Sequence, residues 1–276
     1  SHSAENLRAA AEADDIEAAR FQGEALVFGR DGVSQDIDAG VALLGRAAEA
    51  GDIEATAILG KLLLEGYVVP ASPDRGEALL EEAIAAGHIG ARTTLGLALL
   101  WGVNRTEDPS RAQPLLQEAA DAGDLVAVRV LGQNLLGGWV FEQDTARGIA
   151  LLEQAAAAGD ARAHISLGDH YLNRSEPPAD RARALAHFES AAELNDGEGL
   201  RNYGSHLMWS EADPAEAEAY LRRAGELGVG SAWTTLATGA MFGYLGPDSR
   251  GKFDEFADLG RAAGEERIAV LEAQRQ

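Results

Sequence analysis

The sequence predicts an all-α fold, in which antiparallel helix pairs stack as a solenoid with a 36-residue repeat. Two observations lead to this fold class. Alanine, leucine and glycine are abundant, whereas aromatic residues make up only 6% of the 276 residues, which suits closely packed small helices. One helical pattern with an internal glycine also recurs at a fixed spacing. Because a single helix pair cannot bury its own apolar face, such repeats are expected to stack.

The stretch GDIEATAILGKLLLEG, residues 51–66, defines the first helix of each repeat, which we call helix A. Gly51 suits the left-handed residue that ends the preceding helix, and Asp52 suits an N-cap. Gly60 lies in mid-helix, where glycine costs about 0.8–1 kcal/mol relative to alanine. We therefore expect another helix to cross there so closely that a side chain would separate the two backbones. The same position recurs every 36 residues as Gly96, Gly132, Gly168 and Gly204.

The second helix of each repeat, helix B, shows apolar residues at helical spacing and in most copies ends near an Ala-Ala pair. Its copies span residues 38–51, 74–87, 110–123, 146–159, 181–195 and 213–228. Pro73, Pro109 and Pro214 lie near helix starts, where proline is tolerated. The helices predict one solenoid domain over residues 1–276, with repeats near 15–51, 52–87, 88–123, 124–159, 160–195, 196–228 and 229–264.

Both ends of the array depart from the repeat. Residues 4–15 align with residues 41–52, so they resemble a helix B without its helix A partner, a partial repeat over residues 4–14. We expect the native chain to continue upstream, because the first residues, SHS, lack a methionine and resemble a tag scar. Residues 264–276 are expected to form a capping helix that covers the last repeat.

The pattern resembles the Sel-one-like (Sel1-like) repeat family, which is related to tetratricopeptide repeats. The resemblance implies a right-handed superhelix of antiparallel helix pairs, with the A helices lining its concave side. The residues that carry it in the second copy are Ala55, Leu59, Gly60, Leu63 and Gly66, followed by Ala78, Ala83 and Gly87.

Comparison of the copies separates two faces of helix A. One face keeps small or apolar residues at the positions of Ala55, Leu59, Gly60, Leu63 and Leu64. The other varies from copy to copy, at the positions of Ala57, Ile58, Lys61, Leu62 and Glu65, which share one helical face. If helix A lines the groove, this variable stripe is the binding surface, although a merely solvated face is the alternative. The expected partner-binding residues are Trp101, Arg129, Gln133, Asn134, Asp169, His170, Asn173, Arg201, Asn202, Ser205, His206 and Trp209.

The net charge of −22 limits the classes of partner. Such an acidic surface repels nucleic acids and anionic membranes, and favours a basic protein or peptide or simply solubility. No apolar run approaches the roughly 18 residues of a membrane span, and without cysteine there is neither a disulfide nor a cysteine-based zinc site. The arginine-rich, lysine-poor composition indicates a bacterial protein, either cytoplasmic or periplasmic, and we expect a monomer.

Catalytic and metal sites are not predicted. His170 and His206 should lie on adjacent A helices with Asp169 nearby, but a tetrahedral metal site needs three or four ligands and no further one is evident. Ser166 and His170 are one helical turn apart but lack an orienting acid. The sequence has no phosphate-binding loop. We therefore expect no enzyme activity and no cofactor.

Three functions follow from these observations. The main prediction is a non-enzymatic scaffold or adaptor that holds a protein or peptide in its concave groove. The alternatives are an immunity or inhibitor protein that sequesters a toxin or effector, and a hydrolase or cell-wall-glycan-binding protein that uses the polar end of the groove. The loops after helix A offer a second surface, where an apolar group either forms a lip or folds back over the core: Val68, Val69, Trp139, Val140 and Phe141.

Overall fold

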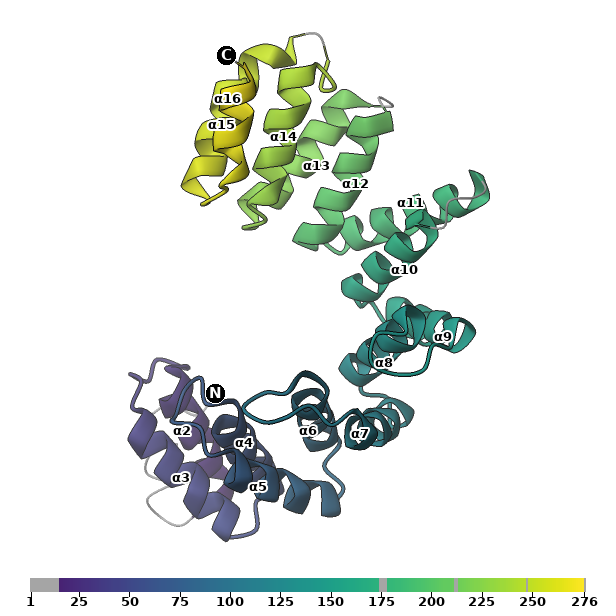
Figure 1. Ribbon diagram of the computed structural model, residues 1–276. Helices are drawn as coiled ribbons and strands as arrows, with labels where there is room; N and C mark the ends of the chain where they lie inside the picture. Colours follow the sequence, from purple (N-terminus) through teal and green to yellow (C-terminus); the bar gives the residue numbers. More distant parts are fainter. Residues whose placement is uncertain (1–14, 174–177, 211–212, 247, 276) are drawn as a thin grey trace. The chain divides into compact units, whose positions relative to one another are not determined.

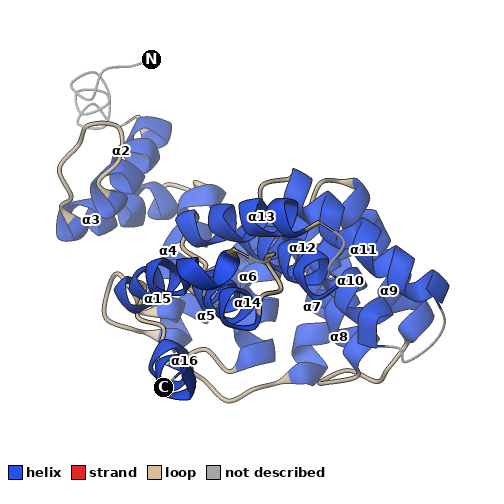
Figure 2. Cartoon of the chain, turned by 90° about the horizontal axis from the view of Figure 1, so that it is seen from above, coloured by secondary structure: helices blue, strands red, loops and turns tan. Residues whose placement is uncertain are grey.

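The computed structural model describes residues 15–173, 178–210, 213–246 and 248–275. The predicted partial repeat at residues 4–14 lies outside the described residues. Every regular element in the described part of the chain is a helix, which confirms the all-α prediction (Figure 2). The A helices are α2 (Ile16–Phe28), α4 (Ile53–Glu65), α6 (Ile89–Trp101), α8 (Leu125–Gly137), α10 (Ala161–Asn173), α12 (Gly197–Ser210) and α14 (Ser231–Phe242).

The B helices alternate with the A helices, as predicted. They are α3 (Ile37–Glu49), α5 (Pro73–Ala85), α7 (Pro109–Asp121), α9 (Thr145–Ala157), α11 (Pro178–Glu193), α13 (Pro214–Glu226) and α15 (Phe253–Ala262). A short 3₁₀ helix, Ser249–Lys252, precedes α15. The last helix, α16 (Arg267–Arg275), packs against α14 and α15 and buries Ile268 at the end of the stack.

Local interactions set the ends of the helices. The side chain of Asp52 accepts a hydrogen bond from the backbone N–H of Ala55 (2.8 Å), and Gly51 has the positive φ of 94° expected of a helix end. His88 is the N-cap of the corresponding helix in the next repeat: its Nδ1 accepts a hydrogen bond from the backbone N–H of Ala91 (2.9 Å). Asn195 replaces the terminal glycine in the fifth repeat and adopts the same left-handed conformation, at φ 57°.

The contacts divide the chain into two compact units, residues 1–145 and residues 146–276. In the first unit, each helix from α2 to α7 packs against the helix that follows it, so the series ends with α8. In the second, α10 to α15 pack in the same consecutive manner (Figure 1). The A helices also contact each other, α4 with α6, α10 with α12 and α12 with α14. The boundary between the units lies at the start of α9, so it separates the two helices of the fourth repeat.

The helix crossing expected at the internal glycine is confirmed. A Cβ placed on Gly60 would lie 3.0 Å from the carbonyl oxygen of Gly76 and 3.0 Å from Leu80 Cγ, both on α5. On Gly96 it would lie 2.9 Å from Leu116 Cγ on α7. Leu80 and Leu116 are fully buried. The glycine therefore allows the B helix of the same repeat to insert a leucine against the A-helix backbone.

The two faces of helix A are less distinct than the sequence suggested. In the second repeat, Ala57 and Leu62 belong to the variable stripe but are buried, whereas Lys61 is exposed. The reason is that α4 packs against α3 and α5 and also against α6 of the next repeat. The accessible part of the stripe is therefore narrower than five positions.

The loops after helix A are anchored in the core at one repeating position. Val69 and Phe141 are buried there, and Arg105, which lies 36 residues from each, forms an ion pair with Glu77. Of the predicted apolar group, only part forms a lip, because Trp139 is 75% exposed and Val140 is also exposed. Sequence could not distinguish these neighbours, since their burial depends on contacts made by the whole loop.

Candidate functional site

In the second unit, the structure places most of the expected partner-binding residues on two helices in direct contact. Helix α10 carries Asp169 and His170, and α12 packs beside it. Asp169 and Trp209 are exposed, and the other members are half-buried. The side chain of Asn173 lies outside the described residues. The members on α12 are Arg201, Asn202, Ser205, His206 and Trp209.

Asp169 is a carboxylate whose surroundings disfavour its charged form. Its side chain is exposed, yet the protein around it excludes enough water to raise the pKa of its carboxyl above its ordinary value. Arg201 opposes this rise in the pKa, and Glu198 adds to it. The Nε of Arg201 already donates to Glu198 at 2.8 Å, so that guanidinium is shared between two acids. A cation supplied by a partner would therefore stabilise the Asp169 carboxylate.

His206, on this face, is held neutral. Partial burial lowers the pKa of His206 below its ordinary value, and the positive charge of Arg181 lowers it further. His170 lies edge-on to the ring of Tyr171, with their centroids 5.3 Å apart. Among the described residues, no three His, Cys, Asp or Glu side chains gather as metal ligands. At neutral pH, His206 can therefore serve as a hydrogen-bonding group rather than as a cation.

The part of the stripe in the first unit is less accessible. Trp101, at the end of α6, is 55% exposed. On α8, Arg129 donates to Gln133 Oε1 at 3.3 Å, and both side chains are half-buried. Asn134 differs from the expectation of an accessible side chain, because it is only 4% exposed and its Nδ2 donates to the carbonyl of Val130 at 3.0 Å. Its neighbours enclose it, so it offers a partner little surface.

Two aromatic residues near Trp209 were not predicted. The ring of Tyr244 lies edge-on to Trp209 with centroids 5.0 Å apart, and Phe242 lies 6.2 Å from Tyr244. Trp209 is 52% exposed and Phe242 is 55% exposed. A sequence signal for Phe242 existed, because it holds in α14 the position that Trp209 holds in α12. The shift to a 33-residue spacing in the last repeat obscured it.

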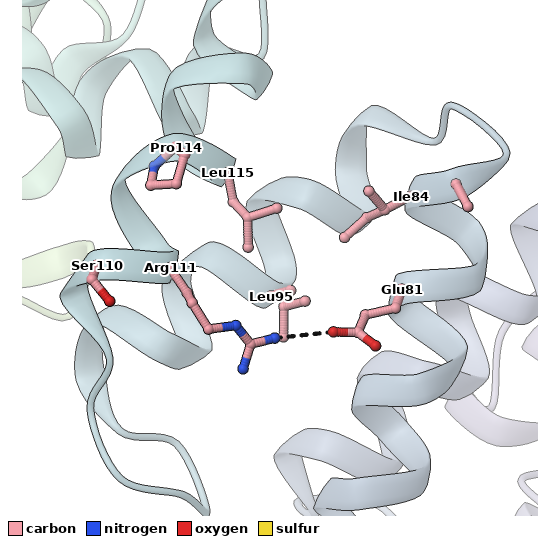
Figure 3. A pocket seen from close by; sticks show the side chains of 8 residues that line it. Glu81, Ile84, Leu95, Ser110, Arg111, Pro114 and Leu115 are labelled. Atoms are coloured by element: carbon pink, nitrogen blue, oxygen red, sulfur yellow. Dashed lines mark hydrogen bonds and ion pairs between the residues drawn. The ribbon is translucent and has the colours of Figure 1, made fainter.

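The first unit has a hollow on its B helices that holds none of the expected residues. It has a volume of about 400 Å³, and Ile84, Leu95 and Leu115 form its apolar wall. At its edge, Arg111 forms an ion pair with Glu81 at 3.0 Å (Figure 3). Arg111 also bonds Glu77 at 2.5 Å. The Ser110 hydroxyl, also at the hollow, donates to Asp108 Oδ1 at 2.6 Å, so the polar side chains that line the hollow are engaged with one another or with their neighbours.

The family model for the Sel1 repeat matches residues 16–52, 53–88, 93–124, 127–160, 161–196 and 198–229. The chain belongs to the Sel1 repeat family. The matched copies confirm the predicted repeat and its resemblance to this family. The matches end at residue 229, so the predicted seventh copy near residues 229–264, occupied by α14 and α15, lies beyond them.

Solved structures share the fold of this Sel1 repeat protein. The protective antigen c5321 of uropathogenic Escherichia coli, which has an SLR fold, is 20% identical with a TM-score of 0.73, over 99% of this chain and 58% of that one. A Sel1 repeat protein of Oxalobacter formigenes is 24% identical with a TM-score of 0.68, over 78% and 89% of the two chains. The immunity protein Pa5087 of Pseudomonas aeruginosa is 19% identical with a TM-score of 0.52, over 79% and 82%. At these identities the likeness shows the fold alone.

The chain spans 58% of the length of the E. coli antigen, so that protein has regions with no counterpart in it. A comparison with curated proteins finds no match. Within the described ranges, none of the helices combines the length and the apolar character needed to cross a membrane.

Proposed function

We propose that this Sel1 repeat protein is a non-enzymatic scaffold that binds a protein or peptide through the exposed A-helix face of its second unit. The observation that carries the proposal is the combination of exposed Trp209 with polar side chains on two contacting helices, α10 and α12. Tryptophan is enriched among the residues that dominate interface energies. Asp169 on α10 and Asn202 on α12 supply hydrogen-bonding groups that a peptide backbone or side chain can use.

The chemistry of the face supports a basic partner. The chain has 22 more acidic than basic side chains, and the excess favours approach of positively charged surfaces. Asp169, with its raised pKa, would gain most from a cation. The Ser166 hydroxyl, which could otherwise act as a nucleophile, already donates to the carbonyl of Arg162 at 2.9 Å. We therefore propose binding without a chemical reaction.

The test begins with capture of the partner from the source cell, identification by mass spectrometry, and measurement of its affinity by calorimetry. A variant with Asp169→Ala, Asn202→Ala and Trp209→Ala, which we call the groove variant, should weaken binding of the partner at least tenfold. It removes an aromatic anchor and two polar contacts. The melting temperature should change little, since none of the three side chains is buried.

The matched control changes Glu189, Glu226 and Leu227 to alanine, three exposed residues at the B helices of the same unit. Its affinity should equal that of the native chain. If the partner binds the groove variant as tightly as the native protein, the A-helix face is not the binding site.

An immunity function is the second candidate. The observation in its favour is the shared fold with an immunity protein of Pseudomonas aeruginosa, together with the net charge of −22. We would then expect a 1:1 complex with a basic effector, dissociated by high salt, in which the effector is inactive. A captured partner whose activity is unchanged in the complex would contradict this function.

A further inference from the structure

Trp209, Phe242 and Tyr244 form a cluster of aromatic rings at one end of the A helices in the second unit, which we call the aromatic cluster. Trp209 and Phe242 lie near the C-terminal ends of α12 and α14, and Tyr244 follows in the loop. The centroid distances of 5.0 Å and 6.2 Å show that Tyr244 joins the two other rings into one surface.

The cluster is unusual because the other phenylalanine and tryptophan rings described in this unit are buried. Trp233, Phe253 and Phe256 belong to the core, whereas more than half of Trp209 and of Phe242 remains in water. Burying an aromatic side chain removes some 150–250 Å² from water, so leaving two neighbouring rings exposed forgoes stability. Exposed apolar clusters of this kind mark interaction sites.

The ring faces suit a cationic side chain. Aromatic faces carry partial negative charge and attract guanidinium groups in particular. The chain already uses this contact inside the second unit, where Arg222 lies 4.7 Å from the centroid of Phe256 and Arg275 lies 4.7 Å from that of Phe253. In the part of the chain that the structure describes, the cation–ring contacts of this unit involve other rings than those of the aromatic cluster.

The charge of the unit favours the same ligand. Residues 146–276 carry 21 acidic and 13 basic side chains. Several of the cations are tied to carboxylates, as Arg222 and Lys252 both are to Glu218. One cation, Arg250, approaches the cluster, with its Nε 3.7 Å from where a Cβ of Gly243 would lie. Arg250 would repel a cationic ligand. Removing its charge by substitution therefore tests whether the ligand is positively charged.

We propose that the aromatic cluster binds arginine side chains of a basic peptide segment in the partner. This inference rests on the proposed function and adds the chemistry of the anchor. The guanidinium would stack on the Trp209 and Phe242 rings, and the excess acidic charge of the unit would attract the segment from solution.

The experiment uses a fluorescent nine-residue peptide with three arginines spaced by glycine and serine, and the same peptide with citrulline in place of arginine. Binding is measured by anisotropy at low salt with the full chain. We expect the arginine peptide to bind at least tenfold more tightly than the citrulline peptide. Trp209→Leu and Phe242→Leu should each weaken the arginine peptide at least fivefold, although neither changes the net charge.

Two further variants test whether binding depends on this particular cluster and on the positive charge of the peptide. Trp139→Leu is the control, because it removes an even more exposed tryptophan from the other unit and should leave the affinity unchanged. Arg250→Gln should tighten binding of the arginine peptide, since it removes a like charge beside the rings. Circular dichroism and melting curves establish that each variant is folded.

The proposal fails if citrulline binds as well as arginine, if the leucine variants keep full affinity, or if Trp139→Leu weakens binding equally. Any of these results would leave only general electrostatic attraction or nonspecific stacking. Failure of the arginine-peptide experiment can be distinguished from failure of the proposed scaffold function. A captured partner that loses affinity for the groove variant supports the scaffold function even when the arginine peptide fails to bind the cluster.

Discussion

Gly76 shows how closely the two helices of the second repeat approach. A Cβ on this residue would lie 2.6 Å from the backbone nitrogen of Leu64 and 2.7 Å from the carbonyl oxygen of Gly60. Both atoms belong to the backbone of α4, so the clash could not be relieved by rotation of a side chain. Gly60 and Gly76 therefore act as a pair, one on each helix, that sets the interhelical distance.

We expect Gly76→Ala to lower the free energy of unfolding by about 1–3 kcal/mol, the usual cost of overpacking. This loss should outweigh the gain of about 1 kcal/mol that alanine has over glycine in a helix. The matched control is Gly45→Ala in α3, where an added Cβ would have no atom within 4 Å and should raise stability by up to about 1 kcal/mol. Urea denaturation measures both, and equal midpoints for the two variants would disprove the close crossing.

The pairing of α10 with α11 includes a contact between two histidines. Nδ1 of His164 lies 3.0 Å from Nδ1 of His187, and the ring of Tyr171 stacks on His187 with centroids 5.8 Å apart. Burial lowers the pKa of His164, against the opposing effects of a backbone hydrogen bond to Ala156 and the charge of Asp160. Burial also lowers the pKa of His187, as does a positive charge on His164, while Glu153 opposes it. The pair is therefore stable in its neutral form.

The second unit should lose stability as the pH falls below about 6.5. The unfolded histidines take up protons near that pH, whereas the folded pair has lowered pKa values and stays neutral, so protons favour the unfolded state. Above pH 7 both states are neutral and the effect is absent. We expect the free energy of unfolding, measured from pH 7.5 to 5.5, to fall by up to about 1.4 kcal/mol per pH unit for each proton taken up.

The control uses residues from other repeats at the same positions. His164→Val copies Val128, and His187→Leu copies Leu151. The double variant should have a much flatter pH dependence, with a remainder from His206, whose pKa is also lowered. A slope equal to that of the native chain would show that the pair is not responsible. The carboxylates Glu77 and Glu218 have lowered pKa values and act at lower pH, outside this range.

Charge is the dominant property of the whole molecule. With 45 acidic and 23 basic side chains, the acids outnumber the bases by 22, so ion pairs within the chain cannot neutralise all of the negative charge. Exposed ion pairs contribute only about 0.2–1 kcal/mol each and are screened by salt. The first unit bears the larger excess, with 24 acidic and 10 basic side chains against 21 and 13 in the second.

Salt should therefore stabilise the protein. We expect the melting temperature to rise between 10 and 300 mM NaCl, on the order of a few degrees, because screening relieves repulsion more than it weakens ion pairs. KCl should have the same effect, whereas a rise with only one of the cations would indicate a specific site. A fall in the melting temperature would mean that ion pairs such as Arg20 with Asp52 outweigh the repulsion.

The sequence by itself determined the helices, their ends and the crossing of each pair. Asp52 caps a helix through a residue three positions away, and Gly51 ends one through its own backbone freedom, so these features are local. The helix crossing at Gly60 depends on another helix, but the recurrence of this glycine every 36 residues allowed the crossing to be predicted from the sequence. The family followed from the same period.

Only the tertiary structure decided which side chains a partner can reach. Asn134 and His206 hold equivalent positions in their repeats, yet Asn134 is enclosed and His206 is half-buried. Tyr244 joins Trp209 from a loop of the next repeat, and His187 meets His164 at positions that hold Leu151 and Val128 in the preceding repeat. The physical reason is that burial and side-chain contact depend on neighbours from other helices and loops, whose side chains differ from one repeat to the next.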